Sequence, residues 1–233
     1  MTADELKRAA ALAALAFVRP GMRLGLGSGS TANHFIDALA EHARANAVDL
    51  LCVPTSEATR QRAESRGLTL SNLDKTPQLD LTVDGADEID DSLRLIKGGG
   101  GAHLREKIVA TSSREMIVIA DHSKRVSVLG AFPLPIEILT FGWVSTMGRI
   151  EAAAQSAGCS GPIRLRSSGT RPFITDNGNL ICDASFGRIA SPEQLAAALS
   201  SVPGVVDHGL FLGIASLALI ATSSGVETLK RAP

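Results

Sequence analysis

Apolar residues along the first half of the chain follow two alternating patterns. Short apolar runs predict β-strands, and between them apolar residues recur every three or four positions, which predicts helices. The predicted strands cover residues 22–26, 50–53, 79–83, 93–96 and 116–120. One helix is predicted after Thr31 and another over 57–66, where Gly67 is well suited to end it. Strands that alternate with helices are typical of βαβ units and indicate a parallel sheet.

The pattern changes after Gly130, where the sequence Phe132-Pro133-Leu134-Pro135 predicts a stiff connector because proline disfavours helix in the residue before it. The elements predicted beyond it are a strand over 136–139, a helix over 144–157, a strand over 163–166, a hairpin of 173–175 with 180–183, and a helix over 192–199. The apolar run 217–222 is predicted to return to the first sheet. We therefore predict an α/β fold in which residues 1–130 and 208–233 form a doubly wound, mostly parallel sheet. Residues 131–207 are predicted to form a smaller α+β domain.

Composition and charge narrow the classes of function. The 233 residues carry a formal net charge of −1, from 23 basic and 24 acidic side chains. No overall attraction to nucleic acid or to an anionic membrane is therefore expected. The 3 cysteines contain no CxxC pair and the 5 histidines show no metal-binding spacing. These counts predict free thiols in a reducing compartment and no bound metal.

The N-terminal segment partly imitates a targeting signal. Lys7-Arg8 precedes an apolar stretch, as in a signal peptide, but Asp4 and Glu5 stand where positive charge is needed. The apolar residues recur at helical spacing and Pro20-Gly21 ends the run, so we predict an amphipathic helix. No apolar run approaches the ~18 residues that a membrane span requires. We expect a cytoplasmic protein.

Four segments rich in glycine or charge each follow a predicted strand directly. Because the carboxyl ends of parallel strands lie along one edge of a sheet, where ligands bind, we expect these segments to meet. The first is Gly27-Ser28-Gly29-Ser30-Thr31, between a strand and a helix. Its flexible backbone, hydroxyls and free helix N–H groups suit a phosphate. It has neither a strict GxGxxG nor a P-loop GK[ST] motif, and a plain strand-to-helix turn is the alternative.

Acidic and glycine-rich residues make up the second and third segments. The run Asp84-Gly85-Ala86-Asp87-Glu88-Ile89-Asp90 does not match calcium-loop spacing, but Asp84 is the first polar residue beyond an apolar strand. Lys97 precedes Gly98-Gly99-Gly100-Gly101, a stretch that is costly to order and can wrap closely around a ligand. Glu106 lies in the first turns of the helix that follows. Each charged group, taken alone, could equally be a solvated surface residue.

The fourth segment, Asp121-His122-Ser123-Lys124-Arg125, follows the strand predicted at 116–120. Lys124 is a candidate to bind a phosphate or a sugar oxygen, and a solvated basic turn is the alternative. We predict that His122 and His103 are accessory residues or lie on a helix surface, and that neither is an acid–base catalyst.

The four segments, in their order along the chain, resemble the motifs of the ribose-5-phosphate isomerase family, type A. The match is carried by Val83-Asp84-Gly85-Ala86-Asp87-Glu88, Ile96-Lys97-Gly98-Gly99-Gly100-Gly101 and Arg105-Glu106-Lys107, and by residues 27–32, 119–124, 132–135, 175–179 and 203–206. The resemblance spans nearly the whole chain and is weakest over 141–170. His103 and Ser28 stand where the family often has leucine and threonine. The resemblance implies a Rossmann-like sheet with a smaller ferredoxin-like domain.

The resemblance also implies an aldose–ketose isomerase that interconverts D-ribose 5-phosphate and D-ribulose 5-phosphate through an enediol(ate), in the non-oxidative pentose phosphate pathway. Glu106 would be the base and Lys97 would stabilise the developing oxyanion. Asp84 and Asp87 would bind hydroxyls, and Asp84 is also expected to shuttle a proton. The substrate-binding residues implied are Ser28, Gly29, Ser30, Thr31, Asp84, Gly85, Ala86, Asp87, Lys97, Gly98, Gly99, Gly100 and Lys124, with Lys7 as a further phosphate contact. No cofactor or metal is implied, and a homodimer or a dimer of dimers is expected.

Other classes of function fit the motifs less well. Amino-sugar phosphate deaminases and CoA transferases of related folds need site motifs other than the DGADE and KGGGG pair. A non-catalytic sugar-phosphate sensor would carry a DNA-binding segment, which we do not expect before Met22 or after Gly209. A nicotinamide dehydrogenase would need an acid at the end of the strand predicted at 50–53, and Asp49 precedes that strand instead.

Overall fold

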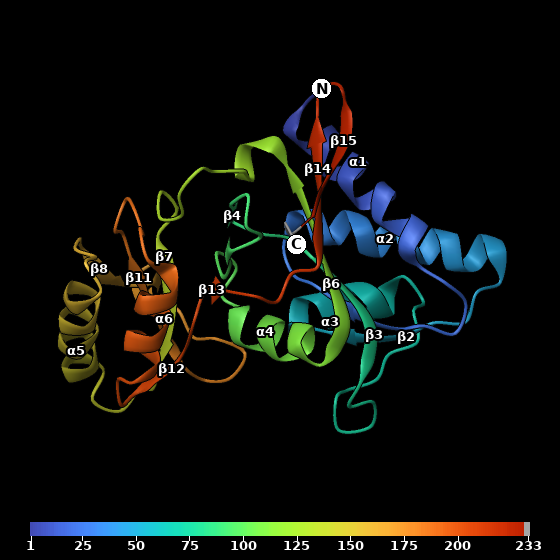
Figure 1. Ribbon diagram of the computed structural model, residues 1–233. Helices are drawn as coiled ribbons and strands as arrows, with labels where there is room; N and C mark the ends of the chain where they lie inside the picture. Colours follow the sequence, from blue (N-terminus) through green and yellow to red (C-terminus); the bar gives the residue numbers. More distant parts are fainter. Residues whose placement is uncertain (231–233) are drawn as a thin grey trace.

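The computed structural model describes residues 1–230, and its largest element is a six-stranded sheet in the order β15-β14-β6-β3-β1-β2. Its strands are β1 (Arg23–Leu26), β2 (Leu51–Pro54), β3 (Leu79–Asp84), β6 (Ser113–Asp121), β14 (Leu217–Thr222) and β15 (Gly225–Lys230). Neighbouring strands are parallel except β14 with β15, which are antiparallel. The prediction of a mostly parallel sheet is confirmed, and β14 returns to it beside β6 as predicted (Figure 1).

Helices cover both faces of this sheet, because its central strands are apolar on both sides. The elements involved are α1 (Ala3–Ala14), η1 (Leu15–Phe17), α2 (Ser30–Asn46), α3 (Glu57–Ser65), α4 (His103–Thr111) and η2 (His122–Lys124). In β6, Ile117 and Ile119 pack into the core beneath α1 and α2. Met116 and Val118 point to the opposite face, toward Ala110 of α4. The doubly wound arrangement is therefore confirmed.

The N-terminal segment forms the predicted amphipathic helix. Thr2 and Glu5 make a capping box, in which each side chain accepts a hydrogen bond from the other residue's backbone N–H. Leu6, Ala10 and Ala14 form part of the buried face of α1. Within residues 1–230, no helix is long and apolar enough to cross a membrane.

A second, four-stranded sheet lies to one side of the first, and we call it with its two helices the antiparallel layer (Figure 1). It consists of β7 (Leu134–Ile138), α5 (Trp143–Ser156), β8 (Ile163–Leu165), β11 (Leu180–Ala184), α6 (Pro192–Ser200) and β12 (Val205–His208). The strand order β12-β7-β11-β8 with this β-α-β-β-α-β sequence is a ferredoxin-like arrangement. The layer has an apolar core of its own, to which Ile136, Ile150 and Leu195 belong.

Three short strands connect the two sheets: β4 (Glu88–Ile89), β5 (Leu95–Ile96) and β13 (Leu210–Phe211). The strand predicted at 93–96 is therefore shorter than expected and does not belong to the parallel sheet. Leu93 has a left-handed backbone, with φ of 58°, and cannot continue a strand. β5 instead pairs antiparallel with both β4 and β13.

The predicted hairpin of 173–175 with 180–183 is wrong in its first arm. Two other short strands, β9 (Ser167–Ser168) and β10 (Arg171–Pro172), pair with each other, while β11 pairs with β7 and β8. The turn itself forms, since the backbone N–H of Gly178 donates to the carbonyl of Thr175. Thr175, Asn177 and Asn179 direct their side chains to the buried carboxylate of Glu137. These polar contacts replace the strand pairing that the pattern predicted.

Candidate active site

A pocket of about 570 Å³ of empty volume opens where the first, second and fourth segments leave β1, β3 and β6. Its lining residues are Lys7, Ser28, Gly29, Ser30, Thr31, Gly85, Ala86, Asp87, Lys97, Gly98, Gly99, Gly100, Glu106 and Lys124. The structure thus brings the four predicted segments together, and of the predicted site residues Asp84 alone is not part of this lining.

Asp84 lies behind the pocket and holds two loops together. Its Oδ1 accepts hydrogen bonds from the backbone N–H groups of Ser28, at 3.1 Å, and Gly85, at 2.7 Å. The same oxygen packs directly on Gly27, where a Cβ atom would lie 2.0 Å from it. Glycine is therefore required at position 27 because the carboxylate of Asp84 occupies the space of a side chain.

The first loop ends where α2 begins, and Gly29 has no side chain to cap that helix. Backbone N–H groups at the start of a helix have no partner within the helix, and the helix dipole adds positive potential there. The hydroxyls of Ser30 and Thr31 line the pocket beside these groups. This end of the pocket is built to hold an anion.

Ser28 is held by a cluster of hydroxyl groups that the sequence motifs did not indicate. Its Oγ lies 2.8 Å from Thr55 Oγ1, 2.8 Å from Ser56 Oγ and 3.0 Å from Thr59 Oγ1. Thr55 and Thr59 donate their protons to backbone carbonyls at the end of β1, and Ser56 donates to Thr59. Ser28 in turn donates to Ser56. Thr55 directly follows β2, so the strand-end rule could have found this cluster.

Lys97 joins two carboxylates in a buried cluster. Its Nζ lies 2.9 Å from Asp84 Oδ2 and 3.4 Å from Glu106 Oε2, and it donates to the carbonyl of Gly85 at 2.6 Å. Asp84, Lys97 and Glu106 are 0%, 2% and 4% exposed. In so dry a setting each charge acts strongly on the others, because little water is present to screen it.

Burial sets the protonation behaviour of this cluster. Loss of water raises the pKa of Glu106 to about 8, and the nearby charge of Asp84 adds to this effect while Lys97 opposes it. Burial likewise raises the pKa of Asp84, against the lowering effect of Lys97. Burial alone would lower the pKa of Lys97, but the two carboxylates outweigh it and raise that pKa. Lys97 is therefore a permanent cation beside a carboxyl that titrates near neutral pH.

Lys97 is positioned in the pocket by a different kind of strand from the one predicted. It follows β5, which is antiparallel to its neighbours and lies outside the parallel sheet. The backbone N–H of Lys97 donates to the carbonyl of Gly209 at 2.8 Å, next to β13. The ring of Phe211 lies 5.5 Å from Lys97 Nζ and 5.1 Å from Lys107 Nζ. Tertiary pairing with β13, and not the end of a parallel strand, therefore places this lysine.

The glycine loop, residues 98–101, lies against Asp87 on one side and α4 on the other. The backbone N–H of Gly99 donates to Asp87 Oδ2 at 2.8 Å. Gly98 has φ of 105°, and a Cβ atom there would lie 2.7 Å from Nδ1 of His103. Only glycine fits this close approach of the loop to the first turn of α4.

His103 is fully buried, so of the two alternatives predicted for it, an accessory residue or a helix-surface residue, the second is wrong. Within residues 1–230 neither ring nitrogen has a hydrogen-bond partner, and Nε2 lies 4.0 Å from Glu137 Oε2. Burial lowers the pKa of His103 to about 3, so the ring is neutral. It is a packing residue beneath the glycine loop. The helical pattern of α4 did not reveal this because the antiparallel layer covers that face.

Residues 51–225 match the family model described as Ribose 5-phosphate isomerase A (phosphoriboisomerase A). The chain belongs to this family. A relative from Sinorhizobium fredii, named Ribose-5-phosphate isomerase A, is 58% identical over 229 residues, which cover 98% of this chain and 99% of the relative. The relative of the same name from Parvibaculum lavamentivorans is 54% identical over 231 residues, covering 99% of this chain and 100% of the relative.

Solved structures show the same fold. The Ribose 5-phosphate isomerase from Plasmodium falciparum superposes with a TM-score of 0.94 at 38% identity, covering 99% of this chain and 100% of that one. Among the residues that the structure describes, no group of three or more His, Cys, Asp or Glu side chains is arranged to hold a metal ion.

Proposed function

We propose that Glu106 is the base of this enzyme and moves a proton between C2 and C1 of the sugar through an enediol(ate). As a member of the ribose 5-phosphate isomerase A family, the chain is an aldose–ketose isomerase that interconverts D-ribose 5-phosphate and D-ribulose 5-phosphate, a step of the non-oxidative pentose phosphate pathway. The buried Asp84–Lys97–Glu106 cluster carries the assignment of roles, since Glu106 is the carboxylate of this cluster that lines the pocket.

The pKa of Glu106 suits a group that must take and return the same proton. A carboxyl with its usual pKa is a weak base at neutral pH, and a base works best when its pKa is near the working pH. Burial has raised the pKa of Glu106 to about 8. Its ionised form is therefore a strong enough base to remove a proton from carbon, and its protonated form can deliver that proton to the neighbouring carbon.

Lys97 supplies the electrostatic stabilisation of the enediolate. Its ammonium group lines the pocket beside Glu106 and stays charged because two carboxylates raise its pKa. A fixed charge of this kind, in a site with little water, typically lowers a barrier by several kcal/mol. We propose that Asp84, which lies behind the lining, acts by holding Lys97. The proton shuttle expected of Asp84 would require the substrate to reach Oδ2, where Lys97 now lies at 2.9 Å.

The two ends of the pocket give the substrate its orientation. The start of α2, the hydroxyls of Ser30 and Thr31 and the ammonium of Lys124 suit the phosphate, with Lys7 as a further cation in the lining. Asp87 lies beside the glycine loop, where it would bind hydroxyls near the reacting carbons.

A solved relative supports a phosphorylated sugar acid as ligand. That D-ribose-5-phosphate isomerase was determined in complex with phospho-erythronic acid, and it matches this chain with a TM-score of 0.92 at 36% identity over 99% of this chain and 100% of the other. The carboxylate of this compound resembles the charge distribution of an enediolate, and such mimics bind more tightly than substrates. We expect phospho-erythronic acid to inhibit this enzyme competitively.

The direct test is to incubate the purified protein with ribose 5-phosphate and to follow the formation of ketose. Steady formation of ribulose 5-phosphate is the expected result, and phospho-erythronic acid should suppress it in competition with substrate. A protein that forms no ketose would overturn the assignment of activity. A protein that forms ketose but is not inhibited would overturn the proposed placement of the enediolate.

We also propose that residues 131–207 form a separate domain and that the enzyme is a cytoplasmic homodimer or a dimer of dimers. The separate apolar core of the antiparallel layer supports the domain boundary. The exposed apolar side chains of Leu139, Phe141 and Val144 on that layer suit a contact between copies. The free, buried cysteines suit a reducing compartment. Light scattering on the purified protein measures the assembly, and a monomer would contradict this proposal.

A further inference from the structure

An arginine of the antiparallel layer holds the glycine loop from outside the pocket. Arg166 follows β8, and its Nη1 donates to the carbonyls of Gly98, at 2.9 Å, and Gly99, at 3.1 Å. Its Nε and Nη2 bind the two carboxylate oxygens of Asp183 on β11. No sequence motif pointed to Arg166, which lies in the stretch where the family resemblance is weakest.

The guanidinium of Arg166 has little freedom to move. The backbone N–H of Arg166 donates to the carbonyl of Ile181, and its carbonyl accepts from the N–H of Phe173. The ring of Phe173 lies 5.8 Å from the guanidinium, and the same ring occupies the space where a Cβ on Gly101 would be. A planar guanidinium that is fixed by a carboxylate can direct its remaining N–H groups accurately.

The hydrogen bonds from Arg166 to the carbonyls of Gly98 and Gly99 determine where the N–H groups of Gly99 and Gly100 point. Every peptide bond in the described residues is trans, so each carbonyl points away from the N–H group of the next residue. The carbonyl of Gly98 accepts from Arg166 and also from the backbone N–H of Gly101, at 2.9 Å, so Gly98 directs the N–H of Gly99 to the other side, where it donates to Asp87. In the same way the carbonyl of Gly99 turns the N–H of Gly100 away from Arg166. Gly100 lines the pocket, and within residues 1–230 its N–H donates no hydrogen bond.

We propose that Arg166 is a positioning residue for the isomerisation. By holding both carbonyls, it aims the N–H of Gly99 at Asp87 and the N–H of Gly100 at a sugar oxygen next to the reacting carbons. Consecutive glycines would otherwise sample many conformations, and two fixed donors would be lost from the site. This inference rests on the proposed roles of the pocket residues. Within residues 1–230 the guanidinium of Arg166 donates to Gly98, Gly99 and Asp183 and makes no hydrogen bond to the start of α2, the phosphate end of the pocket.

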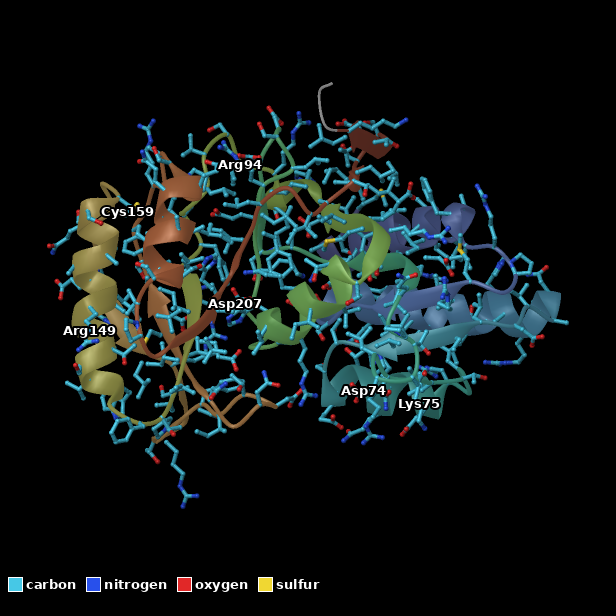
Figure 2. All side chains as sticks on the ribbon, turned by 60° about the horizontal axis from the view of Figure 1, so that its bottom comes forward. Asp74, Lys75, Arg94, Arg149, Cys159 and Asp207 are labelled. Carbon is cyan, nitrogen blue, oxygen red and sulfur yellow. The ribbon has the colours of Figure 1, made fainter. Side chains whose placement is uncertain are left out.

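The test compares Arg166→Ala with Arg149→Ala, a control that removes an exposed arginine from the outer side of α5 (Figure 2). In Arg166→Ala we expect kcat to fall about 10²-fold, the usual scale for a lost preorganised donor. Inorganic phosphate, as a competitive inhibitor, probes the other end of the pocket, and its inhibition constant should stay within about twofold of wild type. Arg149→Ala should leave both values unchanged.

Two milder variants keep the test decisive where Arg166→Ala folds poorly. Arg166→Lys retains the positive charge but not the planar guanidinium. Asp183→Asn retains the arginine but weakens the pairing that fixes its position. Each variant should lower kcat by about tenfold and leave the inhibition constant of phosphate unchanged. A kcat within about twofold of wild type in all three variants would overturn the positioning role. So would a fall in kcat matched by an equal weakening of phosphate inhibition.

The wild-type assay separates this inference from the function on which it rests. A wild-type protein that does not isomerise ribose 5-phosphate refutes the proposed function whatever the Arg166 variants do. An active wild type together with fully active variants refutes only the positioning role of Arg166.

Discussion

Replacement of Glu106 by glutamine separates the chemistry of the base from the packing of its side chain. Glutamine has nearly the same shape but cannot accept the proton, so kcat is expected to fall at least ~10²-fold. The substitution also removes a buried carboxyl group whose ionisation is opposed by burial and by Asp84. The variant should therefore be more stable than the wild-type protein at any pH where Glu106 must ionise. Lost activity together with gained stability is the signature of a group kept for chemistry.

The sign and size of this effect follow from two pKa values. The ordinary pKa of the carboxyl is 4.5, and in the folded protein it is about 8, so the folded state holds the proton more tightly. The resulting stabilisation is fully present below pH 4.5 and is lost as the pH rises through about 8. At ~1.4 kcal/mol for each pH unit, wild type should lose up to roughly 5 kcal/mol relative to Glu106→Gln across this window. The pKa of about 8 already includes the opposing effect of Lys97, so the loss of this ion pair in the variant is part of the figure.

The assay combines ketose formation with urea unfolding at about pH 5.5 and about pH 8.5. Glu151→Gln, which changes an exposed carboxylate on α5, is the matched control and should alter neither measurement. Near-normal turnover in Glu106→Gln would refute the assignment of the base. A stability difference between Glu106→Gln and wild type that is constant or shrinks with rising pH would refute the reasoning about buried ionisation.

Further expected outcomes concern the groups around this base. Lys97→Met leaves two buried carboxylates without their cation. It should lower kcat by about 10²-fold, and urea unfolding should show a free energy of unfolding lower by about 3–5 kcal/mol. Gly27→Ala places a methyl group 2.0 Å from Asp84 Oδ1 and should abolish turnover. Gly148→Ala adds a methyl group in open space on α5, so it should keep turnover and raise the free energy of unfolding by up to about 1 kcal/mol. His103→Leu should keep turnover and raise the melting temperature, with the largest increase below pH 6.5. The folded wild-type protein resists protonation of His103, whose pKa is lowered from 6.5 to about 3, so wild type loses stability as the pH falls through this range and the variant does not. Dialysis against EDTA should leave turnover unchanged, and loss that a divalent ion restores would contradict a metal-free mechanism.

The loops that form most of the pocket could be predicted from the order of apolar and polar residues. Strands β1, β3 and β6 are buried apolar runs, and the polar residue that ends each run marks the sheet edge. Because parallel strands carry their carboxyl ends on one side, Ser28, Asp87 and Lys124 were expected to meet, and they do. The period of the apolar pattern and the geometry of a parallel sheet are enough to predict these loops.

The same reasoning failed where pairing is antiparallel or crosses between sheets. Lys97 reaches the site because β5 pairs with β13, a strand more than a hundred residues further along the chain. The segment 173–175 binds Glu137 through its side chains and forms no strand. Short segments of this kind have little apolar pattern, and partners distant in sequence decide their structure.

The sequence by itself determined which chemical groups are present, the order of the elements and the edge of the sheet where most of the site forms. Only the tertiary structure decided that Asp84 lies behind the pocket, that Glu106 is dry enough to titrate near neutral pH, and that Arg166 holds the glycine loop. Asp207, labelled in Figure 2, shows the same dependence, because it binds Lys107 at 2.6 Å across the junction of the two sheets. Burial and charge act through space, and the groups that supply them here are up to a hundred positions apart in the chain.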